Sequence, residues 1–112
     1  MKIAYIGPFT NMSGLTDAAR NTVEALSSVG VPIQALPVSF EEFKTDCGEL
    51  GKLIQPLIST NPDAPIQIIH TIPPIFDKFI SLEKYNIGYT AWESSRLPHN
   101  WVQNINQLDE VW

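Results

Sequence analysis

Cysteine and basic residues are scarce in this chain of 112 residues. Cys47 is the single cysteine, which excludes an internal disulfide and the paired CxxC motifs of structural zinc sites. Lysine and arginine together number 7 against 12 aspartates and glutamates, so the formal net charge is −5. A chain of that sign repels a phosphate backbone, and we therefore expect no nucleic acid as a partner.

Long apolar runs are also missing. No run approaches the roughly 20 residues that cross a bilayer, so the sequence predicts no membrane span. Residues 1–6 form too short an apolar run for a signal peptide, and no small-residue cleavage site follows them. We therefore expect a cytoplasmic protein.

What the chain does contain is an alternation of apolar runs and helical stripes within a composition that is 44% hydrophobic, which suits one globular domain. Strands are predicted at residues 3–6, 31–38, 66–70, 86–91 and from 109 onward. Helices are predicted at residues 15–29, 40–58 with breaks, 75–82, and from Pro98 with Trp101 or Val102, Ile105 and Leu108 buried. This order predicts an α/β fold, a Rossmann-like parallel sheet with helices on both faces.

Ligands of parallel sheets bind beyond the carboxyl ends of the strands, which directs attention to three loops. The first loop runs from Gly7 to Gly14. Its sequence matches neither the GxGxxG motif nor the phosphate-binding loop of nucleoside triphosphatases. Ser13 and Gly14 nevertheless stand at the start of the following helix, where free N–H groups can receive an anion or a polar ligand. The alternative is that Gly14 only permits a tight turn.

The second loop begins with His70 and Thr71, directly after the strongest predicted strand. A histidine at a strand end can orient a sugar hydroxyl or take part in proton transfer. The alternative is a hydrogen-bonded histidine that only stabilises the loop leading to Pro73 and Pro74.

The third loop is dense in polar and aromatic groups. Trp92 offers a flat apolar face on which a sugar can stack, and Glu93 and Arg96 place charge beside it. Alternatively, Trp92 packs in the core and Glu93 pairs with Arg96 at the surface. With His70 and Glu93 there is no third ligand at metal-binding spacing, so no metal is predicted.

The order and spacing of these segments resemble the N-terminal domain of retaining family 4 glycosyltransferases of the GT-B type. The resemblance is carried by Ile3–Pro8, Gly14 with Ala18–Arg20 and Leu26, Ile68–Thr71 with Pro73–Pro74, Gly88–Glu93 with Leu97, Pro98 and Trp101, and Asp109–Trp112. It covers nearly the whole chain and is weakest over residues 40–62.

The resemblance implies that residues 1–112 are part of an acceptor-side Rossmann-like domain of a hexosyltransferase. The family grips its nucleotide-sugar donor with a C-terminal domain that these residues do not contain, so we expect the chain alone to be inactive. The implied partners are that donor and a sugar or glycan acceptor, without a further cofactor. The implied catalytic residues are His70 and Glu93, and the implied substrate-binding residues are Ser13, Gly14, Thr71, Trp92 and Arg96.

Two other functions stay open at this point. One is a stand-alone flavodoxin-like binding or signalling module, which needs a phosphoacceptor aspartate or a flavin-phosphate loop after Ile6, where Gly7 and Pro8 stand instead. The other is a partner-binding or structural remnant that associates with itself through an exposed apolar edge near Trp112.

Overall fold

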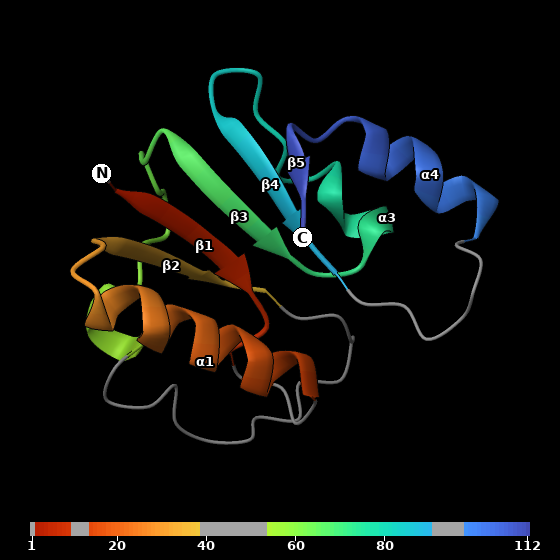
Figure 1. The fold of residues 1–112 in the computed structure, drawn as a ribbon. Helices are drawn as coiled ribbons and strands as arrows, with labels where there is room; N and C mark the ends of the chain where they lie inside the picture. The colour runs from red at the N-terminus through yellow and green to blue at the C-terminus, as the bar shows by residue number, and fades with distance from the viewer. Residues whose placement is uncertain (1, 10–13, 39–53, 91–97) are drawn as a thin grey trace.

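A computed structural model describes residues 2–9, 14–38, 54–90 and 98–112, and these segments form an all-parallel sheet of five strands (Figure 1). The strand order is β2-β1-β3-β4-β5. The strands are β1 (Ile3–Gly7), β2 (Ile33–Pro37), β3 (Ile66–His70), β4 (Tyr85–Tyr89) and β5 (Glu110–Val111). The predicted α/β class and parallel sheet are confirmed.

Helices pack on both faces of this sheet. They are α1 (Gly14–Ser28), the 3-10 turn η1 (Gln55–Leu57), α3 (Pro73–Phe76) and α4 (His99–Asn106). Helix α1 contributes Ala19 and Val23 to a core that includes Ile68 of β3. On the opposite face, Ile69 of β3 packs with Phe76 of α3. Alternate residues of β3 thus enter two separate cores, as a strand buried on both faces requires.

The outer edge beside β2 carries one more parallel bridge. Ile58 pairs with Ala35 of β2, and the N–H of Ser59 donates to the Ala35 carbonyl at 2.8 Å. If this bridge is counted as the third strand position along the chain, the spatial order becomes 3-2-1-4-5-6, which is the order of dinucleotide-binding Rossmann sheets. The five strands without the bridge have the 2-1-3-4-5 order of flavodoxin-like sheets.

Two predicted helices differ in detail from the structure. The helix predicted at residues 75–82 lies instead at Pro73–Phe76, because a proline has the φ angle of a first helical turn and needs no N–H partner there. The sequence predicts that either Trp101 or Val102 of α4 is buried. Val102 is 40% exposed, so the alternative that buries Val102 is wrong. Gly30 follows α1 with φ +88, the left-handed conformation that a glycine commonly adopts after a helix. Cys47 and most of the predicted segment 40–58 lie outside the described residues.

Gly88 allows the helical layer to approach β4 closely. A Cβ atom at this position would overlap with Leu108 Cδ1 and would lie 3.1 Å from Phe76 Cε2. A larger residue would therefore force the Leu108 side chain and the Phe76 ring to shift.

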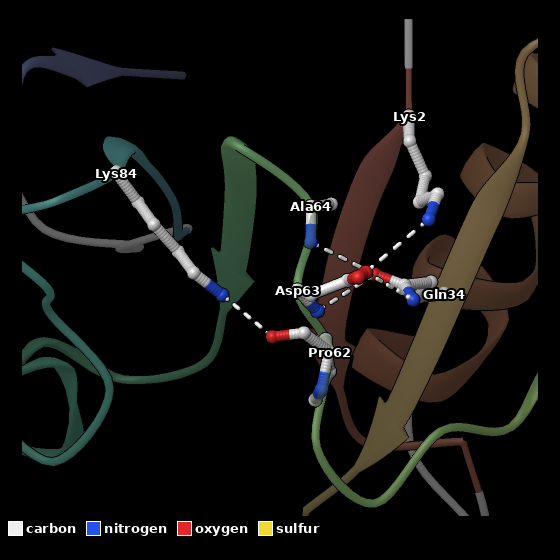
Figure 2. A network of polar contacts seen from close by, with 6 residues as sticks. All are labelled: Lys2, Gln34, Pro62, Asp63, Ala64 and Lys84. Atoms are coloured by element: carbon white, nitrogen blue, oxygen red, sulfur yellow. Dashed lines mark hydrogen bonds and ion pairs between the residues drawn. The ribbon is translucent and has the colours of Figure 1, made fainter.

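The amino-terminal edge of the sheet is tied by a polar network around Asp63 (Figure 2). The Gln34 side chain donates to Asp63 Oδ1 at 2.9 Å and accepts from the Asp63 N–H at 3.0 Å. Lys2 Nζ lies 3.2 Å from the same Oδ1, and Lys84 Nζ donates to the Pro62 carbonyl at 2.7 Å. The network joins the starts of β1 and β2 to the turn that leads into β3.

A second, buried network at the same edge centres on Asn86 of β4. Its Oδ1 accepts from Gln67 Nε2 at 2.6 Å and from the Ser81 N–H at 3.1 Å. Its Nδ2 donates to the carbonyls of Ser81 at 2.8 Å and Lys84 at 3.0 Å. The Asn86 backbone N–H donates to Asp109 Oδ2 at 2.7 Å, which fixes the entry of β5. Every polar group of the Asn86 side chain is therefore bonded, as burial demands.

Candidate functional site

The carboxyl ends of β1, β3 and β4 lie side by side at one edge of the sheet (Figure 1). Ile6 pairs with Ile69, and His70 pairs with Tyr89. The chain leaves β1 towards β2 on one side and leaves β3 towards β4 on the other, so the edge between them is a topological switch point. The ends of β1 and β3 are thus adjacent, as a parallel pairing of these strands requires. Residue 91 itself lies outside the described part, but β4 ends two residues earlier at this edge.

His70 is fully buried at this edge, and one of its ring nitrogens is hydrogen-bonded. Its Nδ1 lies 2.6 Å from the Tyr5 hydroxyl. Its ring stacks on Tyr89, with centroids 3.9 Å apart and planes inclined by 25°. Burial lowers the pKa of His70 from 6.5 to about 4, so the ring is neutral at physiological pH. Among the described residues Nε2 has no hydrogen-bond partner.

Tyr5 supports His70 from the middle of β1. It is fully buried, and its ring contacts His70 edge-on with centroids 5.8 Å apart. Phe9 packs against the same ring at 5.7 Å. Burial raises the pKa of Tyr5 well above its ordinary value, so its hydroxyl remains protonated. The His70 ring is thus held at one edge by Tyr5 and on one face by Tyr89.

Thr71 places a second buried polar atom next to His70. Its side chain is fully buried, and its Oγ1 has no hydrogen-bond partner within the described segments. A buried polar atom left unpaired costs about 1–3 kcal/mol. Two such atoms on consecutive residues, at the ligand-binding edge of a parallel sheet, suit a bound group that supplies the missing bonds.

Arg20 fixes the start of the first loop. Its Nε and Nη2 donate to the Phe9 carbonyl at 3.0 and 2.7 Å. The N–H groups of Phe9 and Val38 both donate to the Gly7 carbonyl, at 3.1 and 2.9 Å. Gly14 is the first residue of α1, so the amino terminus of this helix follows the loop directly.

Two of the predicted site residues, His70 and Thr71, thus lie together with Tyr5 and Tyr89 at the carboxyl edge of the sheet, and we call this group of four residues the corner. Gly14 begins the helix that follows β1, as predicted, but whether it contacts a ligand stays a prediction. Ser13, Trp92, Glu93 and Arg96 lie outside the described residues, and their assigned roles also stay predictions. His99 is exposed at the first position of α4.

Sequence reasoning missed Tyr5 as a partner of His70 and gave Tyr89 no separate role. Tyr5 carried one usable signal, since it is a phenol in the middle of an otherwise aliphatic buried strand. Its contact with His70 depends on the pairing of β1 with β3, and a single sequence does not reveal that register.

In the described segments, no group of three histidine, cysteine, aspartate or glutamate side chains is placed to hold a metal ion. No helix in these segments is long and apolar enough to cross a membrane. The polar groups of the corner are an uncharged histidine, a threonine hydroxyl and two tyrosines, which suit hydrogen bonding to a polar ligand. Comparison of the chain with protein-family models, with curated proteins and with solved structures found no significant match.

Proposed function

We propose that the chain forms the acceptor side of a glycosyltransferase site of the GT-B type. In this proposal a sugar passes from a nucleotide-sugar donor, held by a second domain, to an acceptor bound at the carboxyl edge of β1, β3 and β4. Support comes from the resemblance of the segments Ile68–Thr71 and Gly88–Glu93 to that family, and from the parallel sheet on which those segments end.

The observation that carries the proposal is a pair of buried atoms, His70 Nε2 and Thr71 Oγ1, that have no hydrogen-bond partner in the described part of the chain. A sugar presents hydroxyl groups that both donate and accept hydrogen bonds, and it can therefore satisfy both atoms together. His70 would act through hydrogen bonding and local electrostatics in this scheme, while Glu93 and the stacking face of Trp92 would complete the site from the loop after β4.

The test is a titration of the chain with simple methyl glycosides and with a nucleotide sugar such as UDP-glucose, followed by calorimetry and NMR. We expect weak, millimolar binding of a glycoside and no tight binding of the nucleotide sugar, because one domain supplies only one side of the contact. A Thr71→Val variant should lose the glycoside response, and the control variant Thr60→Val, at an exposed threonine, should keep it. Absence of any glycoside response in the folded chain would contradict the proposal.

One observation favours a second candidate, the flavodoxin-like binding module. The five named strands have the 2-1-3-4-5 order of that class, in which flavin mononucleotide binds at the switch point between the first and third strands. The parallel bridge of Ile58 to Ala35 favours the Rossmann order instead. A parallel titration with flavin mononucleotide decides between the two candidates, because micromolar binding of this nucleotide would support the module and would count against the transferase.

A further inference from the structure

The hydrogen bond between Tyr5 and His70 determines which ring nitrogen of His70 carries the proton. The two heavy atoms, the Tyr5 hydroxyl oxygen and His70 Nδ1, are 2.6 Å apart, and both side chains are fully buried. A neutral imidazole has one N–H donor and one bare acceptor nitrogen. If Nδ1 accepts from Tyr5, Nε2 must carry the proton and act as a donor; if Nδ1 carries the proton, Nε2 must be an acceptor.

We infer that the Tyr5 hydroxyl donates to Nδ1 and holds His70 in the tautomer protonated at Nε2, so that His70 presents a hydrogen-bond donor to the bound group. A phenol is a stronger donor than a neutral imidazole N–H, and an imidazole nitrogen is a stronger acceptor than a phenol oxygen. The short O–H···N bond is therefore favoured over the reverse N–H···O bond.

The other polar group beside Tyr5 is the hydroxyl of Thr22. It donates its own proton to the Ala18 carbonyl at 2.7 Å, as threonines in helices commonly do. Its proton is therefore not available for a bond to Tyr5, although its oxygen is still able to accept the Tyr5 proton. If Tyr5 turned its proton to Thr22, Nδ1 would carry the histidine proton, and this is the arrangement that the experiment below must distinguish.

The consequence concerns the ligand, and this step rests on the function proposed above. A protonated Nε2 is a buried donor, so the group that it meets must offer an acceptor oxygen, and the neighbouring Thr71 hydroxyl can either donate to that group or accept from it. A sugar hydroxyl or ring oxygen offers one, and so does an oxygen of a phosphate. His70 is then a donor that orients or polarises the ligand, and it is not a general base. Tyr5 is a positioning residue that acts through His70.

The experiment is ¹⁵N NMR of histidine side chains in the full chain at neutral pH. The chain has two histidines, and the exposed His99 serves as the internal reference. We expect a pyrrole-type shift at Nε2 of His70 and a pyridine-type shift at Nδ1. In Tyr5→Phe the fixed pattern should be lost, giving averaged shifts of mixed tautomers. In the matched control Tyr85→Phe, which removes a hydroxyl bonded to Glu110 at the other end of the sheet, it should persist.

A protonated Nδ1 in the unchanged protein would overturn the inference, and so would an unchanged His70 pattern in Tyr5→Phe. The backbone amide spectrum of each variant shows whether the fold is kept. His70→Gln supplies a second reading, because its amide places an N–H₂ group near the position of Nε2, whereas the amide of His70→Asn lies nearer to Nδ1.

Ligand binding is then read with two probes, methyl α-glucopyranoside and inorganic phosphate. We expect one of them to shift the Nε2–H resonance of His70, and expect His70→Gln to keep more of that probe's affinity than His70→Asn. A response to the glycoside identifies a neutral sugar oxygen as the acceptor, and a response to phosphate identifies an anionic one. If neither probe binds while the tautomer is as inferred, the role of Tyr5 stands and the proposed function fails.

Discussion

The two edges of the same parallel sheet treat buried polar groups in opposite ways. At the amino-terminal edge, Asn86 uses every donor and acceptor of its side chain, and Gln34 bonds to Asp63 through both its amide nitrogen and its amide oxygen. At the carboxyl-terminal edge, His70 Nε2 and Thr71 Oγ1 find no partner among the described residues. The first edge holds the strands together, and under the proposed function the second keeps two hydrogen-bonding atoms for a ligand. In that proposal, stability and binding depend on opposite ends of the same strands.

The largest expected effect comes from breaking the amino-terminal edge at Asn86. Asn86→Ala should destabilise the fold by about 3–4 kcal/mol, because Gln67, the backbone of Ser81 and the Lys84 carbonyl lose a partner together. Urea unfolding followed by circular dichroism measures the loss. The matched control is Asn104→Ala in α4, where one exposed bond to Asp77 is removed and little change is expected. Equal losses of unfolding free energy in the two variants would contradict the claim that the buried Asn86 network stabilises the fold more than an exposed hydrogen bond does.

The second effect is the acid sensitivity created by burying His70. The folded chain takes up this proton only near pH 4, whereas the unfolded chain takes it up near the ordinary pKa of 6.5. Between these values the unfolded state binds more protons. The contribution of His70 to the free energy of unfolding is therefore fully present above pH 6.5 and is lost as the pH is lowered towards 4. The loss is on the order of 3 kcal/mol. In unfolding measurements across this range, His70→Gln should flatten the decline and His99→Gln should not. A decline that persists in His70→Gln would assign it to other groups.

A third and smaller change in stability is expected at Thr71, and it tests the difference between the two edges of the sheet. Thr71→Val keeps the shape of the side chain and removes a hydroxyl that has no partner in the described segments, so stability should be unchanged or rise by up to about 1 kcal/mol. Thermal unfolding measures this change. A clear loss of stability would mean that the hydroxyl has a structural role, and the carboxyl-terminal edge would then resemble the other one.

The smallest effect is expected at the exposed ion pair of the amino-terminal edge. The Gln34 amide first, and Lys2 second, hold the pKa of Asp63 below its ordinary value, but the carboxylate is in water. Lys2→Met should leave the unfolding midpoint within experimental error, because exposed pairs are screened and the Gln34 bonds remain. A large loss would show that this pair, and not the buried amides, holds the edge.

The parallel sheet and its carboxyl-terminal edge could be predicted from the sequence because both depend on local signals. The β-branched run Ile66–His70 and the alternation of strands with helices define the sheet, and chain direction alone places the carboxyl ends of parallel strands together. The helix boundary at Pro73 was wrong by two residues, since the prediction used apolar spacing and gave too little weight to a proline pair that starts a helix.

The partners of His70 could not be predicted in the same way. Its contacts with Tyr5 and Tyr89 join residues that are 65 and 19 positions away, and only the strand order and register bring them together. Likewise, the lack of a partner for Thr71 Oγ1 depends on how the neighbouring segments pack, which no residue pattern states. The residue types at the site were therefore visible in the sequence, but their bonding state was not.

The most direct test of the division between the two edges is an amide chemical-shift map of the chain titrated with a methyl glycoside. We predict that the perturbed amides cluster at the carboxyl-terminal edge, at Gly7, His70, Thr71 and Tyr89, while those of Gln34, Asp63 and Asn86 stay unchanged. Perturbations centred on the amino-terminal edge, or spread evenly over the sheet, would contradict the account.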